Sequence, residues 1–193
     1  IDDIDDIDDS SIDNIDADDL FEDEEIDAAY DEVRSETLNT ILIGMPGAGK
    51  STVGVVLAKV VGHKFVDSDL VIQEQQGKLL HELITQHGLE GFLEIENQTN
   101  ANLDMTKAVI ATGGSVIYGK EAMEHLREIG LVVYLKLSLE SIAERLGDLQ
   151  QRGVALKEGF GLKELYEERI PLYEKYADIV IDCEEKPIRE ITE

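Results

Sequence analysis

Residues of the types that bind phosphate groups lie at positions 44–51, where the sequence reads Gly-Met-Pro-Gly-Ala-Gly-Lys-Ser. This stretch matches the phosphate-loop pattern of Gly, four residues and Gly-Lys-Ser. Glycines let consecutive backbone N–H groups turn towards phosphates, and the helix after such a loop presents the positive end of its dipole to the same charge. Lys50 is then expected to contact the β- and γ-phosphates, and Ser51 to bind Mg²⁺. The loop predicts binding of a nucleoside triphosphate with Mg²⁺, but it does not distinguish a kinase from an ATPase, a GTPase or a switch.

Two carboxylates, Asp67 and Asp69, follow a short strand-like run at 64–66. Open α/β sheets bind ligands at the carboxyl ends of their strands, so both side chains could face the phosphate loop. One carboxylate there can hold Mg²⁺ or its water, and the other can orient a hydroxyl group and accept its proton during phosphoryl transfer. The pair could instead only cap a helix expected at 70–75, a position for which Asp69 is well placed. The residues alone leave both interpretations open.

Short apolar runs alternate with amphipathic segments from Leu38 onwards, a pattern typical of βα units around a mostly parallel sheet. The phosphate loop follows one such run and precedes an amphipathic segment, as its motif requires. We therefore predict an α/β fold with three layers, α/β/α, built on five strands at 40–43, 64–66, 108–111, 131–135 and 179–181. Helices are predicted at 50–61, 79–87, 91–104, 120–129, 139–146 and 162–177.

Positions 147–161 separate two of the predicted helices and contain four glycines among mostly polar residues. This composition favours a mobile lid over a regular element. A lid that closes over bound phosphates can exclude water and bring positive charge to the reacting atoms. The lid contains Arg152, for which a solvated surface charge is the alternative interpretation.

The first 37 residues differ in composition from the rest of the chain. Ile-Asp-Asp repeats every three residues over positions 1–9, a period that matches neither a helix nor a strand and cannot form a continuous apolar face. Positions 1–36 contain 18 of the 43 acidic residues and only one base, Arg34. We expect 1–37 to be a disordered acidic tail and 38–193 to form the folded domain. A docking segment for an unknown protein partner and an inhibitory strip are alternatives for the tail.

Charge and cysteine content exclude several classes of protein. A formal net charge of −26, without a cluster of Lys and Arg, argues against nucleic-acid binding. The single cysteine, Cys183, excludes an internal disulfide and fits a reducing compartment. No apolar run approaches the ~20 residues that span a bilayer, and no secretory signal opens the sequence. These features predict a cytoplasmic protein without nucleic-acid or membrane partners.

Six motifs occur in a fixed order along residues 38–187. They are the loop at 44–52, Phe-Val-Asp-Ser-Asp at 65–69, Phe-Leu-Glu-Ile-Glu at 92–96, Ala-Thr-Gly-Gly-Ser at 111–115, Arg145 with Arg152, and Arg-Ile-Pro-Leu-Tyr at 169–173. In this order they resemble the shikimate kinase family, and six ordered motifs are far more specific than any one of them. The resemblance covers nearly the whole predicted domain.

The resemblance implies an enzyme that uses ATP and Mg²⁺ to phosphorylate a hydroxyl group of a small hydroxylated acid, shikimate or a related compound. It implies that Asp67 assists the metal, that Asp69 binds the substrate hydroxyl as the base, and that Arg152 neutralises charge on the transferred phosphoryl group. Lys50, Asp69 and Arg152 are thus the catalytic candidates. The implied ATP-binding residues are Gly47, Ala48, Gly49, Lys50, Ser51, Thr52, Arg145 and Pro187, the last two beside the adenine, and the implied substrate-binding residues are Asp69, Gly113, Gly114 and Arg169.

Three positions depart from the pattern of this family. Leu93 stands where the family has an arginine that pairs with the substrate carboxylate, Ser115 replaces a third glycine, and Gly153-Val154 replaces Pro-Leu. Loss of a charge-assisted bidentate contact costs ~1.5–3 kcal/mol, although Arg169 is retained. Two alternatives therefore stay open: a kinase for another polyol or sugar acid, such as gluconate, and an inactive nucleotide-binding regulatory module.

Overall fold

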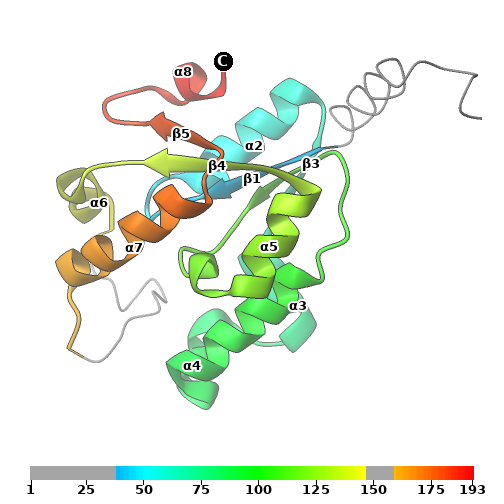
Figure 1. The fold of residues 1–193 in the computed structure, drawn as a ribbon, viewed down its shortest axis with the longest axis vertical. Helices are drawn as coiled ribbons and strands as arrows, with labels where there is room; N and C mark the ends of the chain where they lie inside the picture. The colour runs from blue at the N-terminus through cyan, green and yellow to red at the C-terminus, as the bar shows by residue number, and fades with distance from the viewer. Residues whose placement is uncertain (1–37, 147–158) are drawn as a thin grey trace, which may run out of the picture. The chain divides into compact units, whose positions relative to one another are not determined.

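One sheet of five parallel strands forms the centre of the computed structural model, which describes residues 38–146 and 159–193 (Figure 1). Neighbouring strands pair in the order β2–β3–β1–β4–β5. The strands are β1 Asn39–Ile43, β2 Lys64–Asp67, β3 Ala108–Ala111, β4 Gly130–Lys136 and β5 Ile179–Asp182. The predicted fold class is confirmed. The predicted tail at 1–37, and the predicted lid apart from 159–161, lie outside the described residues.

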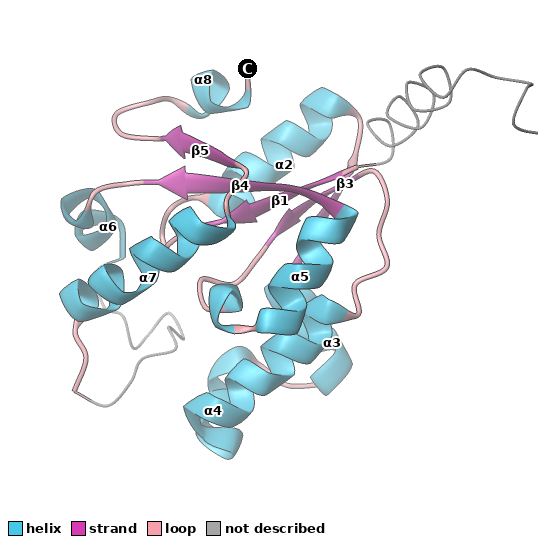
Figure 2. Ribbon diagram, viewed as in Figure 1, coloured by secondary structure: helices cyan, strands magenta, loops and turns pink. Residues whose placement is uncertain are grey.

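Helices cover both faces of the sheet (Figure 2). The helices α2 and α8 lie on one side, and α5 and α7 lie on the other (Figure 1). None of the helices in the described ranges is long and apolar enough to cross a bilayer. Their bounds are α2 Lys50–Val61, α3 Ser68–Gln76, α4 Leu80–Ala101, η3 Val116–Tyr118, α5 Lys120–Ile129, α6 Leu139–Leu146, α7 Leu162–Tyr176 and α8 Ile188–Thr192, where η3 is a 3₁₀ helix.

The two helices predicted at 79–87 and 91–104 form a single kinked element, α4. Gly88 has non-helical dihedral angles, φ 69° and ψ 179°, and it separates the two parts of α4 near the predicted gap. The sequence pattern does not indicate η3 or α8, because helices of three and five residues are too short to show a helical period.

The interior strands are apolar on both faces because helices cover both. Every residue of β3 is buried, as are Ile41, Leu42 and Ile43 of β1. A strand buried on both faces has a continuous apolar sequence instead of an alternating one. The edge strand β5 is less covered, with Ile179 and Val180 about half exposed.

Asn39, the first residue of β1, joins three strands at the amino end of the sheet. Its Nδ2 donates hydrogen bonds to the carbonyl oxygens of Met105 (2.6 Å) and Ile129 (2.9 Å), and its Oδ1 accepts one from the N–H of Ala108 (3.0 Å). The side chain is buried. One amide thereby satisfies three backbone groups at the starts of β3 and β4, at the end of the sheet opposite the phosphate loop.

We predict that Asn39→Ala lowers the free energy of unfolding by about 2–4 kcal/mol, since each buried polar group left without a partner costs roughly 1–3 kcal/mol. Urea unfolding followed by circular dichroism measures the change. Asn102→Ala is the matched control, because the exposed Asn102 amide donates only to the carbonyl of Gln98 and its loss is expected to change stability by less than about 0.5 kcal/mol. Equal losses in the two variants would contradict the structural role of Asn39.

Candidate active site

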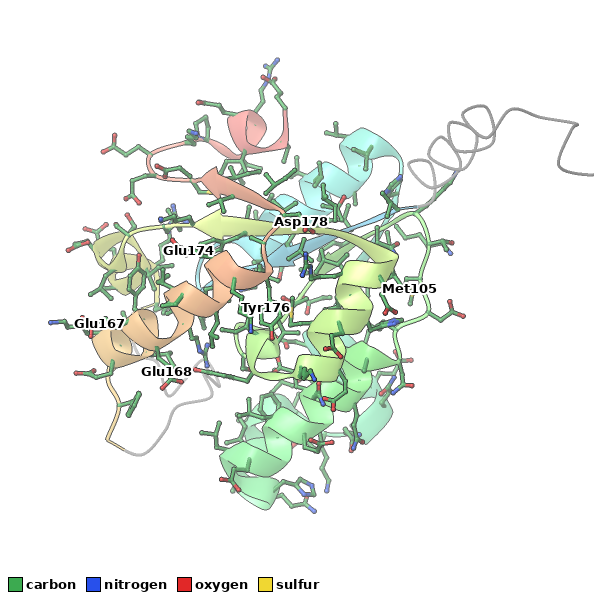
Figure 3. All side chains as sticks on the ribbon, in the orientation of Figure 1. Met105, Glu167, Glu168, Glu174, Tyr176 and Asp178 are labelled. Carbon is green, nitrogen blue, oxygen red and sulfur yellow. The ribbon has the colours of Figure 1, made fainter. Side chains whose placement is uncertain are left out.

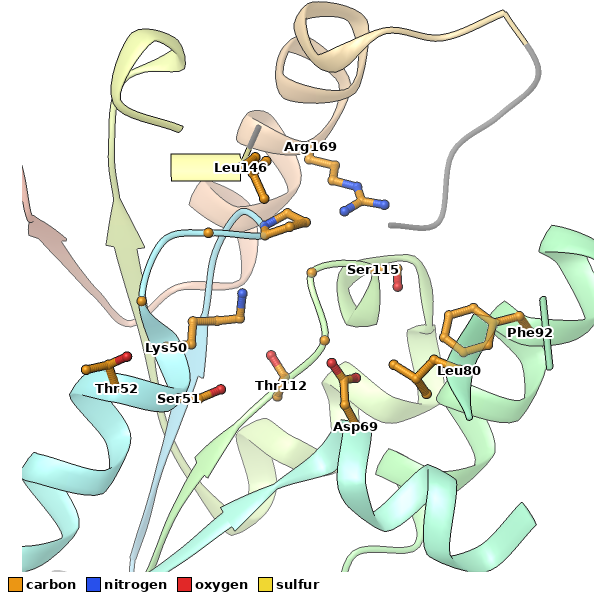
Figure 4. A pocket seen from close by; sticks show the side chains of 15 residues that line it. Lys50, Ser51, Thr52, Asp69, Leu80, Phe92, Thr112, Ser115, Leu146 and Arg169 are labelled. Atoms are coloured by element: carbon orange, nitrogen blue, oxygen red, sulfur yellow. The ribbon is translucent and has the colours of Figure 1, made fainter. Parts of the chain in front are cut away.

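The phosphate loop, residues 44–51, connects the carboxyl end of β1 to the first turn of α2 (Figure 4). Three of its glycines, Gly44, Gly47 and Gly49, have positive φ angles, which side-chain-bearing residues rarely adopt. Within the described residues no side chain caps the N-terminus of α2, and its first turn contains no acidic residue. The terminal N–H groups and the positive end of the helix dipole can therefore stabilise an anion.

Lys50 lies across its own loop. Its Nζ donates hydrogen bonds to the carbonyl oxygens of Gly44 (2.8 Å) and Met45 (3.0 Å). Burial lowers the pKa of Lys50 to about 8, an effect that Asp69 and Asp67 partly oppose. At pH 7 the amine remains mostly protonated, so it brings positive charge to the base of the loop.

Asp67 links the phosphate loop to the second strand. Its Oδ2 accepts a hydrogen bond from the hydroxyl of Ser51 at 2.8 Å, and its Oδ1 accepts one from the N–H of Asp69 at 3.1 Å. The N-cap of α3 is therefore Asp67, and the capping position that the sequence suggested for Asp69 is wrong because the helix begins at Ser68, earlier than expected. Asp69 lies in the first turn of α3.

The oxygen atoms of Ser51 and Asp67 are suited to a Mg²⁺ ion. Hard cations bind to hydroxyl and carboxylate oxygens, and Mg²⁺ usually takes one or two protein ligands together with phosphates and water. No group of three or more His, Cys, Asp or Glu that could hold a metal occurs in the described part of the chain. A metal at this position would thus depend on the phosphates of a bound nucleotide.

A pocket of about 380 Å³ opens between the phosphate loop and α4, above the carboxyl ends of β1 and β3. Figure 4 shows Lys50 on one side of it, Asp69 and Thr112 on its floor, and Arg169 pointing in from α7. Strands on either side of a crossover leave such a crevice in open α/β sheets. The lining residues are Pro46, Gly47, Gly49, Lys50, Ser51, Thr52, Asp69, Leu80, Phe92, Thr112, Gly113, Gly114, Ser115, Leu146 and Arg169.

Asp69 is the carboxylate that faces this pocket. Burial raises its pKa to about 6, the neighbouring charge of Asp67 adds to the rise, and Lys50 opposes it. A carboxylate with a pKa near 6 is still mostly ionised at pH 7, and it is a stronger base than an exposed aspartate. It is therefore able to accept a proton from a hydroxyl group held in the pocket.

The loop after β3 approaches the charged side chains so closely that only glycine fits. A Cβ atom on Gly113 would lie 2.8 Å from Oδ1 of Asp69 and even closer to Oε1 of Glu96. A Cβ atom on Gly114 would lie 2.8 Å from Cδ of Pro46 and 3.0 Å from Nη1 of Arg169. Side chains at either position would push these groups apart and fill the pocket.

Helix α7 brings Arg169 and Tyr173 to the same loop, because residues four apart lie on one face of a helix. The Arg169 side chain is almost fully buried, and its Nε donates a hydrogen bond to the hydroxyl of Tyr118 at 3.2 Å. The hydroxyl of Tyr173 donates to the carbonyl of Gly114 at 2.6 Å. These bonds attach α7 to the Gly113–Gly114 loop and set the position of the guanidinium above the pocket.

Glu96 is a buried carboxylate to which the sequence motif assigned no role. Neither of its oxygens has a hydrogen-bond partner among the described residues, and the nearby hydroxyl of Ser115 stabilises the charged form only in part. Burial raises the pKa of Glu96 to about 7, and the charge of Asp69 contributes in the same direction. Its place in the motif at 92–96 could have marked Glu96 as a functional residue, but the sequence does not show that its side chain faces the back of the Gly113 loop.

The predicted site residues are not all brought together in the described part of the chain. Of those that do not line the pocket, Asp67 contacts Ser51, Ala48 is buried in the core, Arg145 precedes the lining residue Leu146, and Pro187 is the N-cap of α8. Arg152 lies outside the described residues. The roles assigned to these residues remain predictions.

Leu93 does not line the pocket either. It packs against a small apolar cluster formed by Ile72, Leu83 and Phe92. Among the described lining residues, the only cationic side chains are Lys50 and Arg169.

Comparisons with known proteins agree on one family. A family model described as shikimate kinase matches residues 46–193. The shikimate kinases of Thiobacillus denitrificans and Thermodesulfovibrio yellowstonii are 37% and 38% identical, and each match covers 80% of this chain and 86% or 91% of the relative. The structure of Acinetobacter baumannii shikimate kinase in complex with shikimate superposes with a TM-score of 0.74 at 32% identity, over 81% of this chain and 90% of that one.

The raised pKa of Glu96 predicts that stability depends on pH, and we expect Glu96→Gln to weaken this dependence. The carboxyl group deprotonates near its ordinary value of 4.5 in the unfolded chain but near 7 in the folded protein, so the wild type loses stability as pH rises from about 4.5 to 7. Glutamine stays neutral, and the variant is expected to gain roughly 3 kcal/mol relative to wild type between pH 4.5 and pH 8. Urea unfolding across this range measures the difference. Glu94→Gln, an exposed change on the same helix, is the control, and parallel pH profiles for all three proteins would refute the prediction.

Proposed function

Because the chain belongs to the shikimate kinase family, we propose that this small-molecule kinase transfers the γ-phosphoryl group of ATP to a hydroxyl group of shikimate. The observation that carries the proposal is a single pocket with Lys50 and Ser51 on one side, Asp69 on its floor and Arg169 at its far wall. The pocket volume of about 380 Å³ suits a compact acceptor beside a phosphate chain. The Acinetobacter baumannii relative was solved with shikimate bound, which supports the same acceptor here.

The phosphate loop and Lys50 bind the ATP phosphates in this proposal. Lys50 exchanges its bonds to the carbonyls of Gly44 and Met45 for the β- and γ-phosphates, while the backbone of Gly47, Ala48 and Gly49 surrounds them. Ser51 and Asp67 would hold Mg²⁺, which would supply positive charge to offset that of the phosphates. Thr52, which lines the pocket, contributes to the same nucleotide site.

Asp69 acts on the acceptor. It accepts a hydrogen bond from the reacting hydroxyl, orients that oxygen towards the γ-phosphorus and takes its proton as the new P–O bond forms. The close approach of Gly113 leaves room for the acceptor ring beside this carboxylate. Arg169 and the Gly114 backbone bind the other end of the acceptor, where the positive guanidinium can pair with a carboxylate.

The family resemblance supports roles for three further residues, two arginines and a proline. Arg152 neutralises charge that develops on the transferred phosphoryl group, as a cationic residue does in a loose phosphoryl-transfer transition state. Arg145 and Pro187 border the adenine. Arg145 belongs to α6, which also supplies the lining residue Leu146.

A coupled assay of ADP release with a panel of hydroxylated acids tests the proposed function. We expect ADP release that depends on shikimate, a phosphorylated product by mass spectrometry, and no turnover with gluconate. Lys50→Ala is expected to abolish the activity because the loop loses its only phosphate-binding ammonium. If ATP binds in a Lys50-dependent way but no acceptor promotes ADP release, the chain is a nucleotide-binding module and the proposal fails.

We predict that Asp69→Asn lowers kcat by about 10²–10⁴, the usual contribution of a general base, while ATP binding persists. In the wild type, activity should fall as pH decreases through about 6, because protonation of Asp69 removes the base. Initial rates from pH 5 to 8 measure both effects. Asp104→Asn, an exposed change after α4, is expected to keep activity within about two-fold of wild type. A pH profile of Asp69→Asn that shows the wild-type decline would exclude Asp69 as the titrating group.

A further inference from the structure

Tyr118, the last residue of η3, contacts Arg169 in two ways. Its hydroxyl oxygen accepts a hydrogen bond from Nε of Arg169 at 3.2 Å, and its ring centroid lies 5.3 Å from Cζ of the same guanidinium. Both contacts join two elements that are about fifty residues apart in the chain. No motif in the sequence drew attention to Tyr118.

The same hydroxyl also donates a hydrogen bond, to Oε1 of Glu168 at 2.5 Å. Glu168 is the residue before Arg169 on α7, and it is labelled on that helix in Figure 3. The bonds therefore run in one direction, from the Arg169 guanidinium through the Tyr118 hydroxyl to a carboxylate. A carboxylate at the end makes the tyrosine oxygen a better acceptor, because hydrogen bonds in a chain polarise one another.

This arrangement restricts the orientation of Arg169. A guanidinium whose Nε is bonded on one side and whose face rests against a ring has lost most of its rotational freedom. Its Nη1 lies 3.0 Å from the position that a Cβ atom on Gly114 would take, and the guanidinium points into the pocket in Figure 4. An arginine that is already oriented loses less entropy when it binds a carboxylate, so each contact contributes more to affinity.

The departure at Leu93 makes that orientation more important in this chain. Leu93 and Tyr118 line the same surface hollow of about 320 Å³ beside α4 and α5. The residue at position 93 is apolar, and Arg169 is the one guanidinium among the described residues that line the acceptor pocket. A single arginine binds a carboxylate well only if it is held in one geometry.

We propose that Tyr118 is a positioning residue that fixes Arg169 through its hydroxyl group and ring, and that it thereby sets the preference of the enzyme for acceptors that carry a carboxylate. The inference rests on the proposed function, in which Arg169 binds that carboxylate. It assigns to η3 a role in substrate selection in addition to closing the Gly113–Gly114 loop.

Tyr118→Phe tests the proposal, since it keeps the ring and removes the hydroxyl. The KM for shikimate is expected to rise about five-fold, the size of the usual net contribution of one hydrogen bond, while kcat and the KM for ATP stay within about two-fold. The preference in kcat/KM for shikimate over its uncharged methyl ester should shrink by the same factor. Tyr166→Phe is the matched control, because that hydroxyl donates to the carbonyl of Leu137, and it should change none of these values.

Three results would overturn the proposal: a shikimate KM in Tyr118→Phe equal to that of the control, a parallel rise in the KM for ATP, or an equal loss with the methyl ester. A second measurement needs no substrate. The Nε–H proton of Arg169 should exchange slowly with solvent in the ¹⁵N spectrum of the wild-type protein and rapidly in Tyr118→Phe, with Tyr166→Phe unchanged. If the wild type does not phosphorylate shikimate, the proposed function fails. The exchange rate of the Arg169 Nε–H proton still decides whether Tyr118 holds Arg169. Unchanged exchange in Tyr118→Phe would refute the role of Tyr118.

Discussion

Four ionisable side chains surround one glycine-containing loop, and their mutual electrostatics govern the site. Lys50, Glu96 and Arg169 are buried, and Asp69 is partly buried. Burial alone disfavours the charged form of each group, so each depends on the others to remain functional. Lys50 lowers the pKa of Asp69 and Asp69 raises that of Lys50, which keeps both mostly ionised near pH 7. Removal of one member changes the protonation of the rest.

The fold allows this concentration of charge because the groups come from different elements that meet at the carboxyl ends of the strands. The phosphate loop follows β1, Asp69 follows β2, and Gly113 follows β3, the strand that pairs with both β1 and β2. At the amino ends of the strands, the Asn39 amide joins β1 to the starts of β3 and β4, and it contributes to stability and not to ligand binding. The Asn39 hydrogen bonds thus lie at the end of the strands opposite the candidate active site.

In the proposed function, helix α7 connects the nucleotide and acceptor parts of the pocket. Tyr173 holds the Gly114 carbonyl and stacks on Tyr134 of β4, with ring centroids 5.1 Å apart, while Arg169 reaches the pocket one turn earlier. In the proposed function, the acceptor side depends on Arg169, the one arginine among the described residues that line the pocket, and on the groups that hold it. The uncharged Leu93 instead extends the apolar cluster of α4.

The sequence by itself determined the fold class, the five strands and the phosphate loop, because a strand buried on both faces is a continuous apolar run and the loop motif is local. It also identified Asp67 and Asp69, but it suggested Asp69 instead of Asp67 as the cap of α3, because the helix begins at Ser68, two residues earlier than expected. Only the tertiary structure showed that Glu96 is buried without a hydrogen-bond partner among the described residues, and that Tyr118 contacts Arg169. Both properties depend on packing between residues distant in the chain, which no local pattern of residue types encodes.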